Sequence, residues 1–151
     1  MVVVPRDASD EQLLAIVREW LDVLAREEYD AVFAALGYAR SFGEPGAECI
    51  RNNINKYRSP EYYPGVDHFV VTDWRTARGG NPEPLQLIRR YEPNPLGLMV
   101  TVGIDLPLNG RWSDLEADFV LFENNNVEEG YILVLEDIEP LPFQREEDGT
   151  C

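Results

Sequence analysis

The hydrophobic positions of this chain follow a helical period near its start and a period of two in its second half. Ser9 and Gln12 have the spacing of a capping box at the start of the first helical segment. The spacing of apolar residues also predicts a short helix over 29–36, which ends at Gly37, and a third helix over 47–57. In the first helix, apolar residues three and four positions apart predict one buried stripe: Leu13, Ile16, Val17, Trp20, Leu21 and Leu24.

β-Branched and aromatic residues dominate the later segments, and Pro, Gly and Asn separate these segments from one another. This pattern predicts strands over 68–74, 85–91, 98–106, 114–123 and 131–138. Because the helices precede the strands, the expected fold class is α+β, with two or three N-terminal helices packed on one face of a four- to five-stranded antiparallel sheet. We expect a single domain over 1–143 and a disordered acidic tail over 144–151.

The last two expected strands form a hairpin whose two faces differ. Pairing Phe119 with Leu135 places an apolar set on the face toward the helices: Leu115, Ala117, Phe119, Leu121, Leu133 and Leu135. The other face has an acidic end and an apolar end, and the apolar residues on it are Val120, Phe122, Ile132, Val134 and Ile138. In this register Asp118 lies opposite Glu136, and a pair of like charges so placed is destabilising by roughly 0.2–1 kcal/mol.

The charge of the chain sharpens this picture. Its formal net charge is -15, and residues 92–151 carry 14 acidic side chains against only Arg111 and Arg145. Such a field repels nucleic acids and anionic membranes, and it speeds the encounter with a basic protein partner. Solubility alone is the competing explanation of the acidity. Because the start of the chain is too short for a signal segment and no apolar run reaches membrane length, we expect a cytoplasmic protein.

The acidic end of the hairpin is the strongest candidate for a binding site. Three interpretations stay open: a solvated sheet face, a docking surface for a basic partner, and a site for a hard cation that lacks the spacing of a calcium loop. A homodimer through the apolar end is a further alternative. The docking interpretation assigns the partner contacts to Trp112, Asp114, Glu116, Asp118 and Glu136.

No residue pattern indicates catalysis. The chain lacks the spacings of a serine-hydrolase elbow, a phosphate loop, a dinucleotide fingerprint and a zinc site, so we expect no catalytic residue, cofactor or metal. His68 is the single histidine, and a role as a base would need Asp73 or Asp105 beside it. Cys49 fits a buried position on the third helix better than a nucleophile.

Three resemblances accompany these patterns. The segments 110–119 and 133–138, with a Trp-Ser-Asp-Leu strand and a Leu-x-Asp-Ile strand end, resemble small uncharacterised bacterial proteins. The opening helix, from Trp20-Leu21-Asp22 into Glu28-Tyr29-Asp30, is similar to the start of NTF2-like domains. That resemblance implies a curved sheet around a pocket and, in the enzymes, an Asp–His arrangement for which only His68 is present. In size and acidity the chain resembles immunity proteins, which neutralise toxin domains by covering them.

The leading hypothesis is a non-enzymatic acidic protein-binding module that engages a basic partner. Its most specific form is an immunity protein that neutralises a basic toxin domain. The alternative is an NTF2-like pocket protein that binds or converts a small molecule, with His68 directed into a deep apolar cavity. The first hypothesis places the site on the sheet surface, and the second places it inside the fold.

Overall fold

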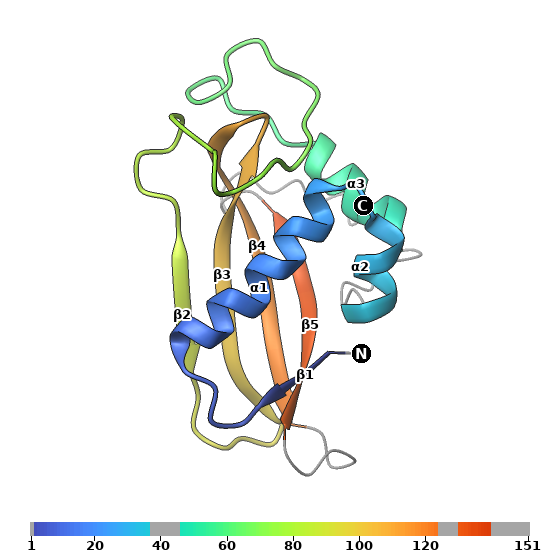
Figure 1. Cartoon of the computed structure of the whole chain (residues 1–151), viewed down its shortest axis with the longest axis vertical. Coiled ribbons are helices and arrows are strands. Elements are labelled where there is room, and N and C mark those ends of the chain that lie inside the picture. The colour runs from blue at the N-terminus through green and yellow to red at the C-terminus, as the bar shows by residue number, and fades with distance from the viewer. Residues whose placement is uncertain (1, 37–45, 124–129, 140–151) are drawn as a thin grey trace.

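The computed structural model describes residues 2–36, 46–123 and 130–139. Within these ranges, three helices and a five-stranded antiparallel sheet form an α+β fold, which confirms the predicted class (Figure 1). The strand order is β1-β5-β4-β3-β2. Gly37 and the tail expected over 144–151 lie outside the described residues. The elements are β1 (Val2–Pro5), α1 (Asp10–Ala25), α2 (Tyr29–Leu36), α3 (Ala47–Asn55), β2 (Gln86–Arg90), β3 (Leu98–Leu108), β4 (Arg111–Glu123) and β5 (Gly130–Glu139).

Helix α1 begins as the capping pair predicts. The Ser9 Oγ accepts a hydrogen bond from the Gln12 N–H at 3.2 Å, and the Gln12 Oε1 accepts one from the Ser9 N–H at 2.7 Å. α1 crosses in front of the sheet, and α2 and α3 lie on the same side, so the described helices cover one face only (Figure 1). The predicted stripe packs toward the sheet, with Leu13, Val17, Leu21 and Leu24 buried and Ile16 and Trp20 half-buried.

The sequence patterns did not predict strand β1. β1 pairs antiparallel with β5, where Val4 lies opposite Tyr131 and is 0% exposed. Four residues that end in proline are too short to show an alternating pattern, and their pairing depends on a strand at the other end of the chain. β1 takes the edge of the sheet and covers the backbone of β5, which would otherwise be an edge strand.

The strand predicted over 68–74 is wrong. The segment forms a single isolated bridge, between Val71 and Leu108, and then turns away from the sheet. Its Thr72 N–H donates a hydrogen bond to the Pro107 carbonyl of β3 at 3.0 Å, and its Val70 carbonyl accepts one from the Asn109 N–H in the turn that follows β3. Phe69 and Val71 are each 1% exposed. The β-branched and aromatic residues of this segment therefore reflect burial in the core rather than membership of a ladder.

A two-residue turn joins β3 to β4. Asn109 and Gly110 have φ values of 52° and 80°, as a type I′ turn requires, and Leu108 pairs with Arg111 across them. The pairing next to this tight turn extends both strands beyond the ends predicted at residues 106 and 114. The turn therefore belongs to the hairpin that carries the acidic residues.

The β4–β5 hairpin confirms the predicted register close to its loop. Phe119 lies opposite Leu135, and Leu121 lies opposite Leu133. These residues share one core with the buried stripe of α1. All six residues predicted on the helix-facing side are at most 1% exposed: Leu115, Ala117, Phe119, Leu121, Leu133 and Leu135.

Further along the same hairpin the predicted register is wrong. A register shift beside Asp118 places this residue opposite Asp137, so Asp118 does not face Glu136. The shift brings Ile138 opposite Ala117 and into the core, where it is 2% exposed. One extra residue in a strand exchanges its two faces. The burial of Ile138 is therefore the physical reason for the irregularity, and it removes Ile138 from the predicted outer face.

Two further observations concern the described part of the chain as a whole. No helix within it is long and apolar enough to cross a membrane. Cys49 is 2% exposed on α3, which confirms its predicted place in the core, and it is not a free thiol.

Candidate functional site

The face of β4 that points away from the helices carries the predicted carboxylates. Leu115 and Ala117 point into the core and are 0% exposed, whereas Asp114, Glu116 and Asp118 are half-buried. Because successive side chains of a strand alternate between its faces, these three carboxylates share the face that the helices leave uncovered. The structure therefore brings together three of the five residues predicted at the docking surface.

Glu116 and Asp118 converge over a glycine of the neighbouring strand. Gly103 of β3 lies opposite Asp118. A Cβ atom on Gly103 would lie 3.3 Å from Asp118 Oδ1 and 3.6 Å from Glu116 Oε1, so both carboxylates lean over the glycine backbone. We call Gly103, Glu116 and Asp118 the carboxylate notch. Because Gly103 has no side chain, both carboxylates can lie against its backbone, and the negative charge gathered there suits a cationic group.

Asp105 adds a third carboxyl group beside the notch. It lies opposite Glu116 and is 7% exposed. Its Oδ2 accepts hydrogen bonds from the Leu85 N–H at 2.7 Å and from the Asn81 side-chain amide at 3.1 Å. Burial, reinforced by the charges of Glu116 and Asp114, raises the pKa of Asp105 to about 6, although the Leu85 hydrogen bond opposes this shift. At neutral pH Asp105 is therefore mostly ionised and strengthens the negative potential at the notch.

Asp114 is tied to the core by Tyr57. The Tyr57 hydroxyl donates a hydrogen bond to Asp114 Oδ1 and accepts one from the Asp114 backbone N–H at 3.3 Å. Burial, followed by the bond to Asp114, raises the pKa of Tyr57. The Tyr57 ring packs edge-to-face on Tyr63 and Phe69, with centroid distances of 5.9 and 5.2 Å. Asp114 therefore supports the end of β4, and one of its carboxylate oxygens is already hydrogen-bonded.

The remaining predicted residues lie apart from the notch. Glu136 is exposed where the β4–β5 ladder shifts and skips it. Trp112 is half-buried and lines a pocket beside α1. His68 is exposed, does not line that pocket, and has its backbone carbonyl bound by the Asn109 side chain at 2.9 Å. The expectation that His68 points into a cavity is therefore wrong.

The apolar end of the uncovered face lies next to the notch along β4 and β5. Val120 lies opposite Val134, and Phe122 lies opposite Ile132. Val120 is 6% exposed, and the other three side chains are half-buried. Charged and apolar contact surfaces therefore lie side by side on one face of the sheet.

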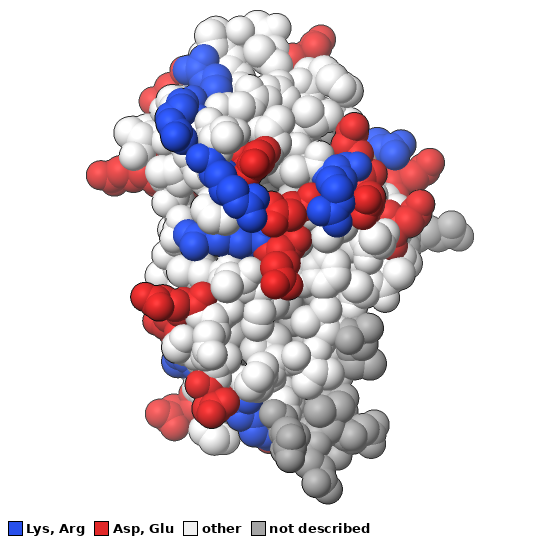
Figure 2. Space-filling model, viewed as in Figure 1, with Lys and Arg blue, Asp and Glu red and all other residues white. Residues whose placement is uncertain are grey.

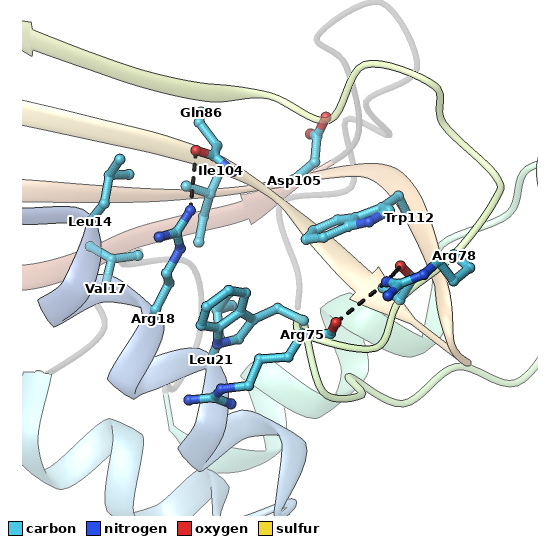
Figure 3. A pocket seen from close by; sticks show the side chains of 12 residues that line it. Leu14, Val17, Arg18, Leu21, Arg75, Arg78, Gln86, Ile104, Asp105 and Trp112 are labelled. Carbon is cyan, nitrogen blue, oxygen red and sulfur yellow. Dashed lines mark hydrogen bonds between the residues drawn. The ribbon is translucent and has the colours of Figure 1, made fainter. Parts of the chain in front are cut away.

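A second candidate site lies on the helix side, where α1 meets β3 and residues 74–78. It is a cavity of about 280 Å³ whose lining includes Leu14 and Leu21 of α1 together with Trp74 and Trp112 (Figure 3). Figure 2 views this side of the molecule and shows Lys and Arg side chains in a band that reaches the middle of the face, next to Asp and Glu side chains. This side therefore presents cations, although the chain as a whole is acidic.

Neither site contains a cluster of metal ligands among the described residues. In residues 2–36, 46–123 and 130–139, no group of three or more His, Cys, Asp or Glu side chains is arranged to hold a metal ion. The two sites differ in charge: carboxylates lie on the uncovered sheet face, and arginines surround the pocket.

No protein-family model, no curated protein and no solved structure matches this chain.

Proposed function

We propose that this chain is a non-enzymatic binding protein whose carboxylate notch holds a basic side chain of a protein partner. The convergence of Glu116 and Asp118 over Gly103 is the observation that carries the proposal. Carboxylates this close repel each other, and a guanidinium or ammonium group between them removes the repulsion. Among the described residues, no arginine or lysine forms an ion pair with Glu116.

The surroundings of the notch favour a protein over a free ion as the partner. The apolar end beside it can form a contact that excludes water, and an apolar centre next to a polar rim is the usual arrangement of a protein interface. The net charge of -15 steers a basic partner toward the chain. In the most specific form of the proposal, the partner is a basic toxin domain and this chain is the immunity protein that covers it.

The test compares the wild-type chain with a charge-reversed variant that carries Glu116→Lys and Asp118→Lys. A partner held at the notch should bind this variant at least about 100-fold more weakly, because attraction becomes repulsion at both positions. The matched control carries Glu19→Lys and Glu61→Lys, which changes two exposed carboxylates outside the notch and gives the same net charge. Thermal unfolding should show that both variants fold.

The partner is first captured from a native lysate and purified. Its affinity for the wild-type chain and for each variant is then measured at low and at high salt. Unchanged affinity of the notch variant would contradict the proposal. An equal loss in the control would show that only the total charge matters, which also contradicts a specific notch. If the chain captures only itself and light scattering gives the mass of a dimer, the apolar end acts in a homodimer instead.

A further inference from the structure

The pocket between α1, β3 and residues 74–78 carries an inference that is independent of the carboxylate notch. Figure 3 shows Arg18 and Leu14 on one side of this pocket and Trp112 with Arg78 on the other. Leu21 of α1 contributes to its apolar lining. Its volume of about 280 Å³ lies close to the lower limit of small-molecule sites. A ligand of one or two rings is therefore the size that this pocket suits.

Arg75 is not the charge that a ligand would meet. Its guanidinium binds the Asp22 carboxylate with distances of 2.8 and 3.0 Å, and it lies 3.1 Å from Asp73 Oδ1. The bond from Arg75 lowers the pKa of Asp22, as an ion pair should. The same guanidinium lies 4.6 Å from the centroid of the Trp74 ring. Arg75 is therefore a neutralised part of the pocket wall.

Arg18 and Arg78 differ from Arg75, because no carboxylate among the described residues forms an ion pair with either of them. The Arg18 Nη2 donates to Gln86 Oε1 at a long 3.4 Å, and Arg78 donates to two backbone carbonyls of its own loop. Arg18 is half-buried, whereas Arg78 is exposed. Two arginines at one pocket without a carboxylate partner in the described part of the chain make it a favourable place for an anion, although the chain has a net charge of -15.

The Trp112 indole gives the pocket a flat wall. The guanidinium groups of Arg18 and Arg75 each lie 4.6 Å from a ring centroid of Trp74, so two cations already stack on this second indole. Trp112 lines the opposite side. Asp105 also lines the pocket, but Figure 3 shows its carboxyl group turned away from the arginines, and its Oδ2 already accepts two hydrogen bonds.

We infer that this pocket binds a small aromatic carboxylate. The ring lies between the apolar floor and the Trp112 indole, and the carboxylate accepts hydrogen bonds from the Arg18 guanidinium. The Gln86 amide, whose oxygen already accepts from Arg18, has an NH₂ group that can donate to the same carboxylate. Arg78 at the mouth attracts the anion without needing to touch it.

The three tryptophans of the chain make the inference directly testable. The probes are 1-naphthylacetate and its neutral analogue 1-naphthylacetamide, and the readout is the indole N–H signals in ¹H–¹⁵N spectra. Naphthylacetate should shift the signals of Trp74 and Trp112, with a Kd of about 1 mM or lower. Trp20 does not line the pocket, so its signal serves as an internal control. The amide should bind at least about 10-fold more weakly, because it carries no charge for Arg18 to meet.

A pair of variants locates the charge effect. Arg18→Gln should weaken naphthylacetate binding about 10-fold and leave the amide unchanged, whereas Arg89→Gln, an exposed change on β2 outside the pocket lining, should alter neither. Equal affinity for acid and amide in the wild-type chain would overturn the inference even if Arg18→Gln failed to fold. Shifts confined to Trp20, or no effect of Arg18→Gln in a folded variant, would overturn it as well.

Discussion

The two faces of β4 share one stretch of backbone and differ in nearly everything they contact. Toward the helices, Leu115, Ala117 and Phe119 are at most 1% exposed and pack in the common core. Away from the helices, Glu116 and Asp118 are half-buried and lean over the backbone of β3. The first face fixes where the helices lie, and the second is free to carry charge. Stability and recognition are therefore separable along this one strand.

The sheet also separates charges of opposite sign. The uncovered face gathers carboxylates at the notch, and the helix side gathers Arg18, Arg75 and Arg78 around a pocket. The two sites therefore favour ligands of opposite charge. Variants on either side should affect one site and leave the other intact, and the predictions below test how far this separation extends to stability.

The largest effect is expected for Phe119→Ala. Phe119 is 1% exposed in the core, so its truncation should lower the free energy of unfolding by about 3–5 kcal/mol. The matched change on the other face is Phe122→Ala, which should cost less than about half as much because Phe122 is only half-buried. Urea unfolding measures both. Equal losses would show that the uncovered face is packed as tightly as the core.

Asp105→Asn should change the free energy of unfolding less than Phe119→Ala does, and it should raise this free energy instead of lowering it. The pKa of Asp105 is about 6 in the folded chain, above its ordinary value of 3.8. The folded state therefore holds the proton more tightly than the unfolded state, and this contribution to stability is present below pH 4 and is lost as the pH rises through 6. Replacing the carboxylate should therefore raise the free energy of unfolding at pH 7 by about 1–3 kcal/mol.

Urea unfolding at several pH values between 4 and 8 tests whether Asp105→Asn raises the free energy of unfolding. The difference between Asp105→Asn and the wild-type chain should be small near pH 4 and should grow up to about pH 7. Asp67→Asn, at an exposed position, is the control and should follow the wild type. A difference that does not change with pH would mean that the altered hydrogen bonds to Leu85 and Asn81, rather than the charge, set the stability.

The predictable parts of the fold were those with strong local signals. Ser9 and Gln12 marked the start of α1, and the alternation around Phe119 placed its hairpin register and its helix-facing side correctly. Helical and strand periods are local properties that burial on one face imposes. The segment around Val71 misled because burial alone, without a neighbouring strand, selects the same residue types.

The parts that were missed depend on contacts between distant segments. β1 exists only because β5 offers it an edge, and the register shift beside Asp118 arises because Ile138 is buried. The importance of Gly103 and Asp105 for the site on the uncovered face was also missed. A glycine and an aspartate interrupt a mostly apolar strand there, and a glycine inside a strand often marks a close approach of another group. That the interruption faces Glu116 could be seen only once β3 and β4 were paired.

The smallest effect is expected for Tyr57→Phe, which cuts the link between the core and the uncovered face. The variant keeps the ring that packs on Tyr63 and Phe69 but removes the hydroxyl that binds Asp114. The change removes both hydrogen bonds of the hydroxyl with Asp114, one to a partly exposed carboxylate and one from the backbone N–H at a long 3.3 Å, and should lower the free energy of unfolding by about 1 kcal/mol.

Tyr91→Phe is the matched control for this change. Tyr91 is 40% exposed, so loss of its hydroxyl should alter the free energy of unfolding by less than about 0.5 kcal/mol. A loss of several kcal/mol for Tyr57→Phe would mean that the core depends on Asp114, and the two faces of β4 would then not be separable. A loss near 1 kcal/mol would mean that Tyr57 only positions Asp114, so that the acidic end of the strand is free to vary with its partner while the core stays the same.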